Sequence, residues 1–417
     1  MIIIEKPYRI ECELGNITTT SHTVKNEGRT VFDSSSEFFD ETGPREPFRS
    51  KRFTELLLDF STDMSNRSAS ARLNRVRLET GGGINPMTLN NVVQREGLAM
   101  QRYIEEHCAK TLKENGITIG DSGQLHRKIE FSVQKGEHIT EEEIQVAADN
   151  LKIESFNASD YDAPEQTVSI SADGVGVRRQ TECRPCSKLE GEQLKRVNNT
   201  VVHVEIGGRH FVLHSGTVIG AFKQLVSFLL HNDLLEKQLV FFADGARDLN
   251  NMITNMFRKL HFKIILDWYH LEKKCLEQLS MALKGSEIRN AFMDKLRPTL
   301  WFGRVDEAIN LLQTLEPEKI KNPNVLKKLG EYFERVRDHI PCYALRKELG
   351  LRNSSNAVEK ANDIIVAKRQ KGNGMSWSDD GSVALASVSA AKHNGQLQTW
   401  VNSRCINFSL NCGTAAA

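Results

Sequence analysis

Apolar and polar positions change pattern several times in the middle of the chain. Residues 167–173 (TVSISAD) alternate between apolar and polar, which is typical of a strand with one buried face. Two more alternating segments follow, joined by Gly207 and Gly208, a pair that favours a tight hairpin. An amphipathic stretch then predicts a helix, and two apolar runs separated by a second helical stretch end on Asp244 and Asp267. The predicted order is strand, strand, strand, helix, strand, helix, strand.

This order predicts an α/β protein with a mixed sheet covered by helices, because hairpin-linked strands come first and helical crossovers follow. Residues 268–349 show only helical periodicity, which predicts an all-helical insertion. A further helix is expected over residues 357–369, after capping residues in the stretch NSSN. We therefore divide this part of the chain into a first core segment at 166–284, a helical insertion at 285–349 and a last core segment at 350–417.

The chain before the sheet is predicted to be irregular at first and then helical. Residues 1–50 are polar and are interpreted as an irregular segment. Residues 51–118 hold helical stretches interrupted by GGGINP, an arrangement similar to a helix-turn-helix whose second helix begins near Pro86. Residues 119–165 are mixed and polar and are interpreted as a helical connector.

Local charge in the predicted helix-turn-helix is positive. Residues 45–77 contain eight Arg or Lys and four Asp or Glu, a balance that suits contacts with DNA phosphates. The alternative is a small helical bundle with a solvated basic face. The candidate DNA-binding residues in this region are Arg72, Arg75, Arg77, Asn90, Asn91, Gln94 and Arg95.

Composition suits a globular protein with a core. Of 417 residues, 39% are hydrophobic and 26% are charged, and the mean hydropathy is −0.41. No apolar run approaches the length needed to cross a bilayer, so no membrane partner is expected. The start, MIIIEKPYRI, lacks the basic and longer apolar parts of a signal peptide, which favours a cytoplasmic protein. The net charge of +1 does not decide whether nucleic acid is a partner.

Eight cysteines are spread along the chain and are expected to be reduced in the cytoplasm. Cys183 and Cys186 form a CxxC pair. Zinc would need further ligands, a redox pair is a second possibility, and a polar loop with two thiols is the third.

Acidic residues follow the apolar runs. Asp173 and Asp244 are predicted at the carboxyl ends of neighbouring strands, where ligand sites gather in open sheets. Two carboxylates held together favour a cation between them, and hard divalent metals prefer oxygen ligands. Glu359, on the helix after the insertion, is the candidate third ligand. The simpler alternatives are strand-ending turns at both Asp-Gly pairs and a capping-box role for Glu359.

Four motifs carry a resemblance to a known family: SADGVGVRR, FFADGARDL, ILDWYHLEKK and NSSNAVEKANDIIVAKRQ. Together they resemble the core of bacterial insertion-sequence transposases of the DDE type, in particular the ISLre type. The resemblance covers about residues 165–405. It implies a ribonuclease-H-like fold with a helical insertion, preceded by a helical DNA-binding region. One departure is that Cys12 stands alone until Cys108, so an amino-terminal zinc ribbon is not expected.

The resemblance also implies roles for particular residues. Asp173, Asp244 and Glu359 would bind two Mg²⁺ or Mn²⁺ ions, and Asp267 and His270 would form an accessory Asp-x-x-His pair. That pair is either structural or orients DNA, and His270 alone could simply contact its own chain. The implied partners are double-stranded DNA, both element ends and target, and further copies of the chain in a dimer or larger assembly, in a bacterial cytoplasm near the nucleoid.

The implied function is metal-dependent DNA strand cleavage followed by strand transfer. Two alternatives are a catalytically silent DNA-binding protein derived from such an enzyme, and a nuclease of the same fold that does not join strands. Residues 346–371 contain seven Arg or Lys and three Asp or Glu, and Lys368 and Arg369 are expected to reach towards phosphate. The alternative is a solvated helix face. Competing third acids in the insertion are Glu331, Glu334 and Asp338.

Overall fold

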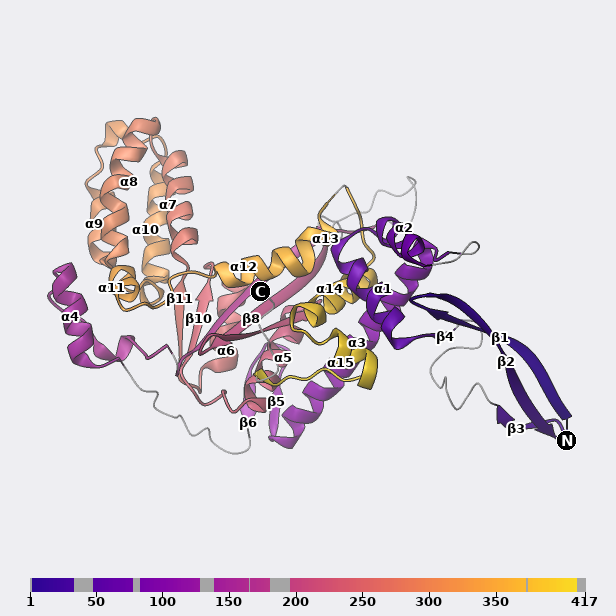
Figure 1. The fold of residues 1–417 in the computed structure, drawn as a ribbon. Helices are drawn as coiled ribbons and strands as arrows, with labels where there is room; N and C mark the ends of the chain where they lie inside the picture. Colours follow the sequence, from indigo (N-terminus) through magenta and orange to yellow (C-terminus); the bar gives the residue numbers. More distant parts are fainter. Residues whose placement is uncertain are drawn as a thin grey trace.

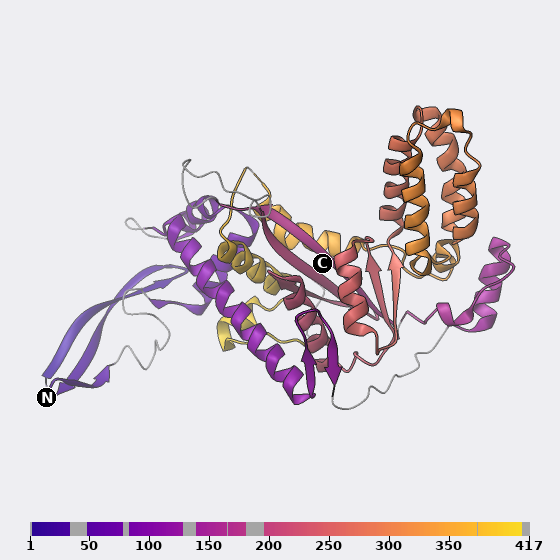
Figure 2. The same ribbon diagram turned by 180° about the vertical axis from the view of Figure 1, so that it is seen from behind.

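The computed structural model describes residues 2–33, 48–77, 83–127, 139–164, 166–180, 196–372 and 374–410. These residues form a mixed α/β protein with a main sheet of five strands. Figures 1 and 2 show this sheet with helices on its faces, a helical bundle on one side and a long β-hairpin arm on the other.

The main sheet has the strand order β11-β10-β7-β8-β9. The first three strands along the chain, β7 to β9, are antiparallel neighbours, whereas β10 is parallel to both β7 and β11. The predicted order of strands and helices is confirmed. The strands are β7 Val168–Arg178, β8 Arg196–Ile206, β9 Arg209–Ser215, β10 Leu239–Ala243 and β11 Phe262–Leu266.

The hairpin between β8 and β9 turns at the predicted glycine pair. Gly207 and Gly208 have φ of +54° and +75°, a left-handed conformation that a residue with a Cβ adopts only with strain. The helical crossovers are α5 Val218–His231 and α6 Arg247–Phe257.

Both faces of the main sheet are covered, because successive side chains of a strand point to opposite faces. Val168 and Ile170 of β7 belong to the large core that includes α5 and α6. Val175 and Val177 of the same strand pack instead on the opposite face, against a helical segment near the carboxyl end. That segment is α12 Asn356–Asn362, a π-helical turn η5 Asp363–Ala367 and α13 Lys368–Gln370.

The region before the sheet contains the predicted helices, α1 Lys51–Asp63, α2 Asn66–Val76 and α3 Pro86–Glu114. Helix α3 packs against α14 Asp379–His393 so closely that a Cβ at Gly97 would overlap the Ala384 carbonyl oxygen. The buried Glu96 beside it accepts a 2.9 Å bond from Trp400 and an ion pair from Arg404. Helix α3 is therefore a core helix along much of its length. Trp400 belongs to the last helix, α15 Leu397–Ser403.

The expectation of an irregular amino-terminal segment is wrong. Strand β1 Ile2–Cys12 pairs with β2 Gly15–Asn26 in an antiparallel hairpin, and β3 Arg29–Asp33 adds a third strand. The hairpin extends away from the body as an arm (Figures 1 and 2). Its base is tied by β4 Phe48–Arg49, which pairs with β1, and by a buried Arg49–Glu11 ion pair of 2.8 Å.

The predicted connector is helical only in part. Its helix is α4 Glu141–Leu151, which begins with a capping box formed by Thr140 and Glu143. A short hairpin, β5 Ile117–Ile119 and β6 Leu125–Arg127, comes before it. The short turn η1 Ala158–Asp160 follows.

The expectation that residues 268–349 are helical is confirmed, and they form a bundle whose hydrophobic core continues onto the sheet through Val240, Phe242, Ile265 and Leu266. The predicted start of the insertion at 285 is wrong, because the helix over residues 268–282 already packs in the core of the bundle. The bundle stands off the end of the sheet beside β11 (Figures 1 and 2). The main helices of the bundle are α7 Trp268–Ala282, α8 Ser286–Trp301, α9 Val305–Gln313 and α10 Pro323–Arg335. Shorter pieces complete it: η3 Pro317–Lys319, η4 Arg337–His339 and α11 Tyr343–Glu348. In the part of the chain that the structure describes, no helix is long and apolar enough to cross a membrane.

Two helix glycines give a matched test of the packing between α3 and α14. Replacing Gly97 with Ala should lower the free energy of unfolding by about 1–3 kcal/mol, because the added methyl meets the backbone of Ala384. In α10, a Cβ at Gly330 would only touch Leu312 at 3.8 Å. Gly330→Ala should therefore stabilise the protein by about 0.5–1 kcal/mol. Urea unfolding of both variants measures the difference, and equal effects would contradict the close packing.

Candidate functional site

Asp173 and Asp244 are neighbours in the main sheet. The β7–β10 register pairs Ser171 with Phe242, and continuing it by two residues brings Asp173 level with Asp244. Adjacent strands are about 4.8 Å apart, so the two acids emerge side by side. The prediction that the first strand ends on Asp173 is wrong, because β7 continues to Arg178 through pairing with β8.

The Asp173 carboxylate is half-buried and uses both oxygens. Oδ1 accepts a bond of 2.7 Å from the Gly174 amide, and Oδ2 accepts one of 2.6 Å from Nδ2 of Asn362. Burial raises the pKa of Asp173, and the nearby charges of Asp244 and Glu359 raise it further, against the lowering effect of the two hydrogen bonds. Asp244 and Glu359 are therefore each close enough to Asp173 to disfavour its charged form.

Asp244 follows the last residue of β10 and is exposed. Its Oδ1 accepts a bond of 2.8 Å from the Ala246 amide, which closes a tight turn. Gly245 in this turn has φ of +84°, and a Cβ there would lie 3.2 Å from the Tyr332 hydroxyl of the bundle. The alternative interpretation of Asp244 as a residue of a strand-ending turn is therefore confirmed. The turn uses only one of the two carboxylate oxygens of Asp244.

Glu359 approaches from the helix that covers this face of the sheet. Its Oε1 lies 2.9 Å from Nε2 of His270, in the first turn of α7, with side-chain exposures of 42% for Glu359 and 29% for His270. The N-cap of α12 is Ser355, whose side chain makes no capping bond. The capping-box interpretation of Glu359 is therefore wrong, and His270 contacts a distant segment and not only its own chain.

Asp267 anchors the two segments that carry His270 and Glu359. It is fully buried, caps α7 by accepting a bond of 2.9 Å from the His270 amide, and accepts bonds from the Ser355 amide and hydroxyl. These contacts hold the start of α7 next to the start of α12. The same carboxylate thus places both His270 and Glu359.

The competing acids of the insertion lie elsewhere. Glu331 and Glu334 are exposed on α10, where they pair with Lys327 and Arg337, and Asp338 is also exposed. None of the three is among the groups that shift the pKa of Asp173, whereas Glu359 is. Of the four candidates, Glu359 is the one that the fold brings near Asp173.

The donor chemistry of the site suits Mg²⁺ or Mn²⁺, because carboxylate and amide oxygens are the ligands that these ions prefer. Among the described residues, however, no group of three or more His, Cys, Asp or Glu side chains is arranged to hold a metal ion. Each acid is turned towards a hydrogen-bond partner within the protein. Ion binding would therefore require rotation of these side chains.

The predicted DNA-binding residues divide into exposed and buried groups. Arg72 and Arg75 are exposed on α2, as are Asn91 and Arg95 on α3. Asn90 and Gln94 are half-buried. Arg77 is buried, with its guanidinium over the Phe53 ring and a bond of 2.7 Å to Asn16. The prediction that Arg77 faces DNA is therefore wrong.

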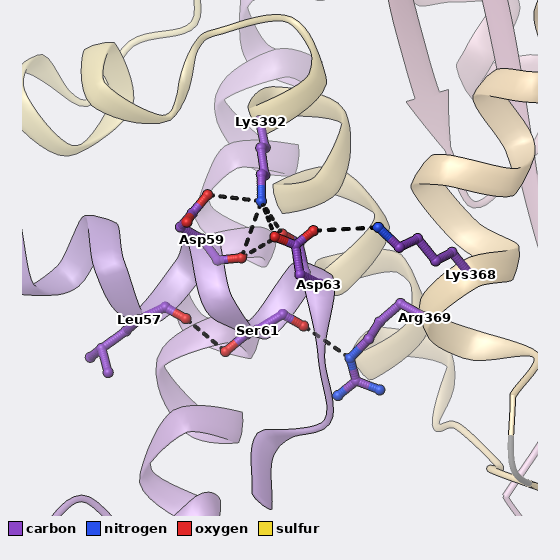
Figure 3. A network of polar contacts seen from close by, with 8 residues as sticks. Leu57, Asp59, Ser61, Asp63, Lys368, Arg369 and Lys392 are labelled. Carbon is purple, nitrogen blue, oxygen red and sulfur yellow. Dashed lines mark hydrogen bonds and ion pairs between the residues drawn. The ribbon is translucent and has the colours of Figure 1, made fainter. Parts of the chain in front are cut away.

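Lys368 and Arg369 bind the amino-terminal helices, as Figure 3 shows. Arg369 is 5% exposed and donates a bond of 2.9 Å to the Ser61 carbonyl, so the expectation that it reaches towards phosphate is wrong. Lys368 is exposed, with Asp63 at 3.8 Å. Lys392 binds Asp63 at 2.7 Å in the same network. These contacts join α1 to the segment that carries Glu359.

Sequence reasoning missed Asn362 and Ser355, which contact the acids directly. Asn362 lies three positions after Glu359 and thus on the same side of the helix, which is the signal that could have identified it. Cys183 and Cys186 lie outside the described residues. No protein-family model and no curated protein matches the chain.

Removing the Asp267 carboxylate should destabilise the protein. Asp267→Ala removes an N-cap worth about 1 kcal/mol and leaves buried donors of Ser355 unsatisfied at about 1–3 kcal/mol. As a matched control, Asp248→Ala changes an exposed first-turn acid of α6 and should cost less than about 1 kcal/mol. Urea unfolding compares the two, and equal losses would contradict the anchoring role of Asp267.

Repulsion at Asp173 predicts a pH-dependent stability difference in the presence of a chelator. A raised folded-state pKa means that wild type loses stability as pH rises from the ordinary aspartate value through the folded value. Asp173→Asn cannot ionise, so its stability relative to wild type should increase across that interval and then level off. Urea unfolding between pH 3.5 and 7 measures this, and a relative stability that does not change with pH would contradict it.

Proposed function

We propose that this protein is a DDE-type transposase with a ribonuclease-H-like catalytic core. The observation that carries the proposal is the level placement of Asp173 and Asp244 on neighbouring strands, with Glu359 reaching them from a covering helix. Three antiparallel strands followed by two parallel ones, with a helical insertion before the glutamate helix, also support it. The proposed substrate is double-stranded DNA in a bacterial cytoplasm, bound by a dimer or larger assembly.

In this proposal Asp173, Asp244 and Glu359 would hold two Mg²⁺ or Mn²⁺ ions. Such ions, when bound, supply charge stabilisation for the attacking and leaving oxygens of a phosphodiester. The protein contributes position: the sheet fixes both aspartates, Asp267 fixes the helix ends, and His270 orients Glu359. No covalent enzyme intermediate is needed, since water and then a DNA 3′-hydroxyl are the nucleophiles.

Exposed arginines on α2 offer a phosphate-binding surface for the same DNA. Arg72 and Arg75 are three positions apart, and Arg67 is exposed on the same helix. Electrostatic binding of this kind weakens as salt increases. The buried Arg77 and Arg369 are not part of the proposed surface.

Cleavage assays test the proposal. In Mn²⁺ or Mg²⁺, a plasmid carrying the DNA that flanks the gene should be cut by wild type. Asp173→Asn, Asp244→Asn and Glu359→Gln should each reduce cutting by on the order of 100-fold or more, because each removes a ligand charge. Glu331→Gln, on the exposed face of α10, is the matched control and should cut normally.

The same assay separates the alternatives. Joined products show strand transfer, and cut but unjoined products favour the nuclease. Binding of flanking DNA without any metal-dependent cutting favours the catalytically silent DNA-binding protein. Retained cutting by one of the three acid variants would remove that acid from the proposed site.

A further inference from the structure

Asn362 is the last residue of α12 and lies next to the candidate acids. It is 4% exposed, and its Nδ2 donates a bond of 2.6 Å to Oδ2 of Asp173. The orientation of the amide follows from chemistry, because an ionised carboxylate only accepts hydrogen bonds. The amide nitrogen must therefore face Asp173, and the amide oxygen must point away from that carboxylate oxygen.

The amide oxygen of Asn362 is buried and has no hydrogen-bond partner in the described structure. Buried polar atoms without a partner are uncommon in folded proteins, and each one costs free energy unless something absent from the chain itself satisfies it. Asp173, its hydrogen-bond partner, and Glu359, three positions earlier in the helix, both carry carboxylates, which only accept hydrogen bonds when ionised. A group that carries hydrogen-bond donors or positive charge is what the position lacks.

The helix changes its geometry directly after Asn362. Residues Asp363–Ala367 form a π-helical turn, a wide turn that is rare and often found at functional sites. Within this turn, Ile365 and Val366 are buried against the strands of the main sheet. The turn therefore anchors the helix on the sheet directly after Glu359 and Asn362.

We propose that Asn362 is a positioning residue of a divalent-cation site. Its amide N–H fixes the Asp173 carboxylate, and its unpartnered oxygen accepts from the water shell of the bound cation. This inference rests on the proposed function, since it takes Asp173, Asp244 and Glu359 as the ligands. Asparagine suits the position because it both donates and accepts, whereas an aspartate would add a fourth negative charge.

Direct cation binding tests the inference without an activity assay. Mn²⁺ is titrated into the full-length, DNA-free protein by isothermal calorimetry, well below the melting temperature of each variant. Asn362→Ala and Asn362→Leu should each weaken Mn²⁺ binding by about 10-fold or more, the usual effect of losing a residue that orients a ligand. The Leu variant fills a similar volume, so agreement between the two separates the loss of the amide from the loss of packing.

Asn356→Ala is the matched control, since Asn356 is exposed at the start of the same helix and should leave the affinity unchanged. Asp173→Asn reports on the proposed ligands themselves and should abolish binding. Wild-type affinity in both Asn362 variants, with binding lost in Asp173→Asn, would overturn the inference and leave the proposed function standing. If wild type does not bind Mn²⁺, or Asp173→Asn binds it normally, the metal site of the proposed function fails and this inference fails with it.

Discussion

Asp267 is fully buried, and its carboxylate accepts hydrogen bonds from both ends of the helical insertion. The His270 amide lies just after it, whereas Ser355 lies 88 positions further along the chain. Two more bonds close the same base: the Trp268 amide donates to the Asn353 carbonyl, and the Tyr343 hydroxyl donates to the Leu266 carbonyl. A buried carboxylate is tolerated only when donors surround it, so this junction has one stable arrangement.

Closing the insertion at its base fixes the segment that carries the candidate third acid. The bundle also shares its hydrophobic core with the sheet, through Val240 and Phe242 of β10 and Ile265 and Leu266 of β11. The first turns of α7 and α12 are held side by side by Asp267, and this brings His270 to Glu359 at 2.9 Å. The position of the candidate third acid therefore depends on the contacts that the buried Asp267 makes beside it.

The sequence was sufficient to predict those elements whose hydrophobic pattern matches the burial of their side chains in the structure. The five strands of the main sheet, its crossovers and the helices of the insertion were predictable from periodicity. The arm was not, because β1 and β2 have polar residues on both faces and no core to reveal their alternation. The burial of Arg77 and Arg369 was also missed, since only tertiary contacts with Asn16 and Ser61 distinguish them from surface arginines.

Glu96, a structural carboxylate, and Asp173, a candidate functional one, differ in the charges that surround them. Glu96 is buried, which raises its pKa, but Arg404, Trp400 and Arg95 outweigh burial and lower the pKa overall. Asp173 is also withdrawn from solvent, yet in the described part of the chain no lysine or arginine forms an ion pair with it, and its charged neighbours are acids. Among the described residues the chain thus supplies cations to Glu96 and none to Asp173. Leaving Asp173 without one costs stability, which is understandable if the missing positive charge comes from a ligand.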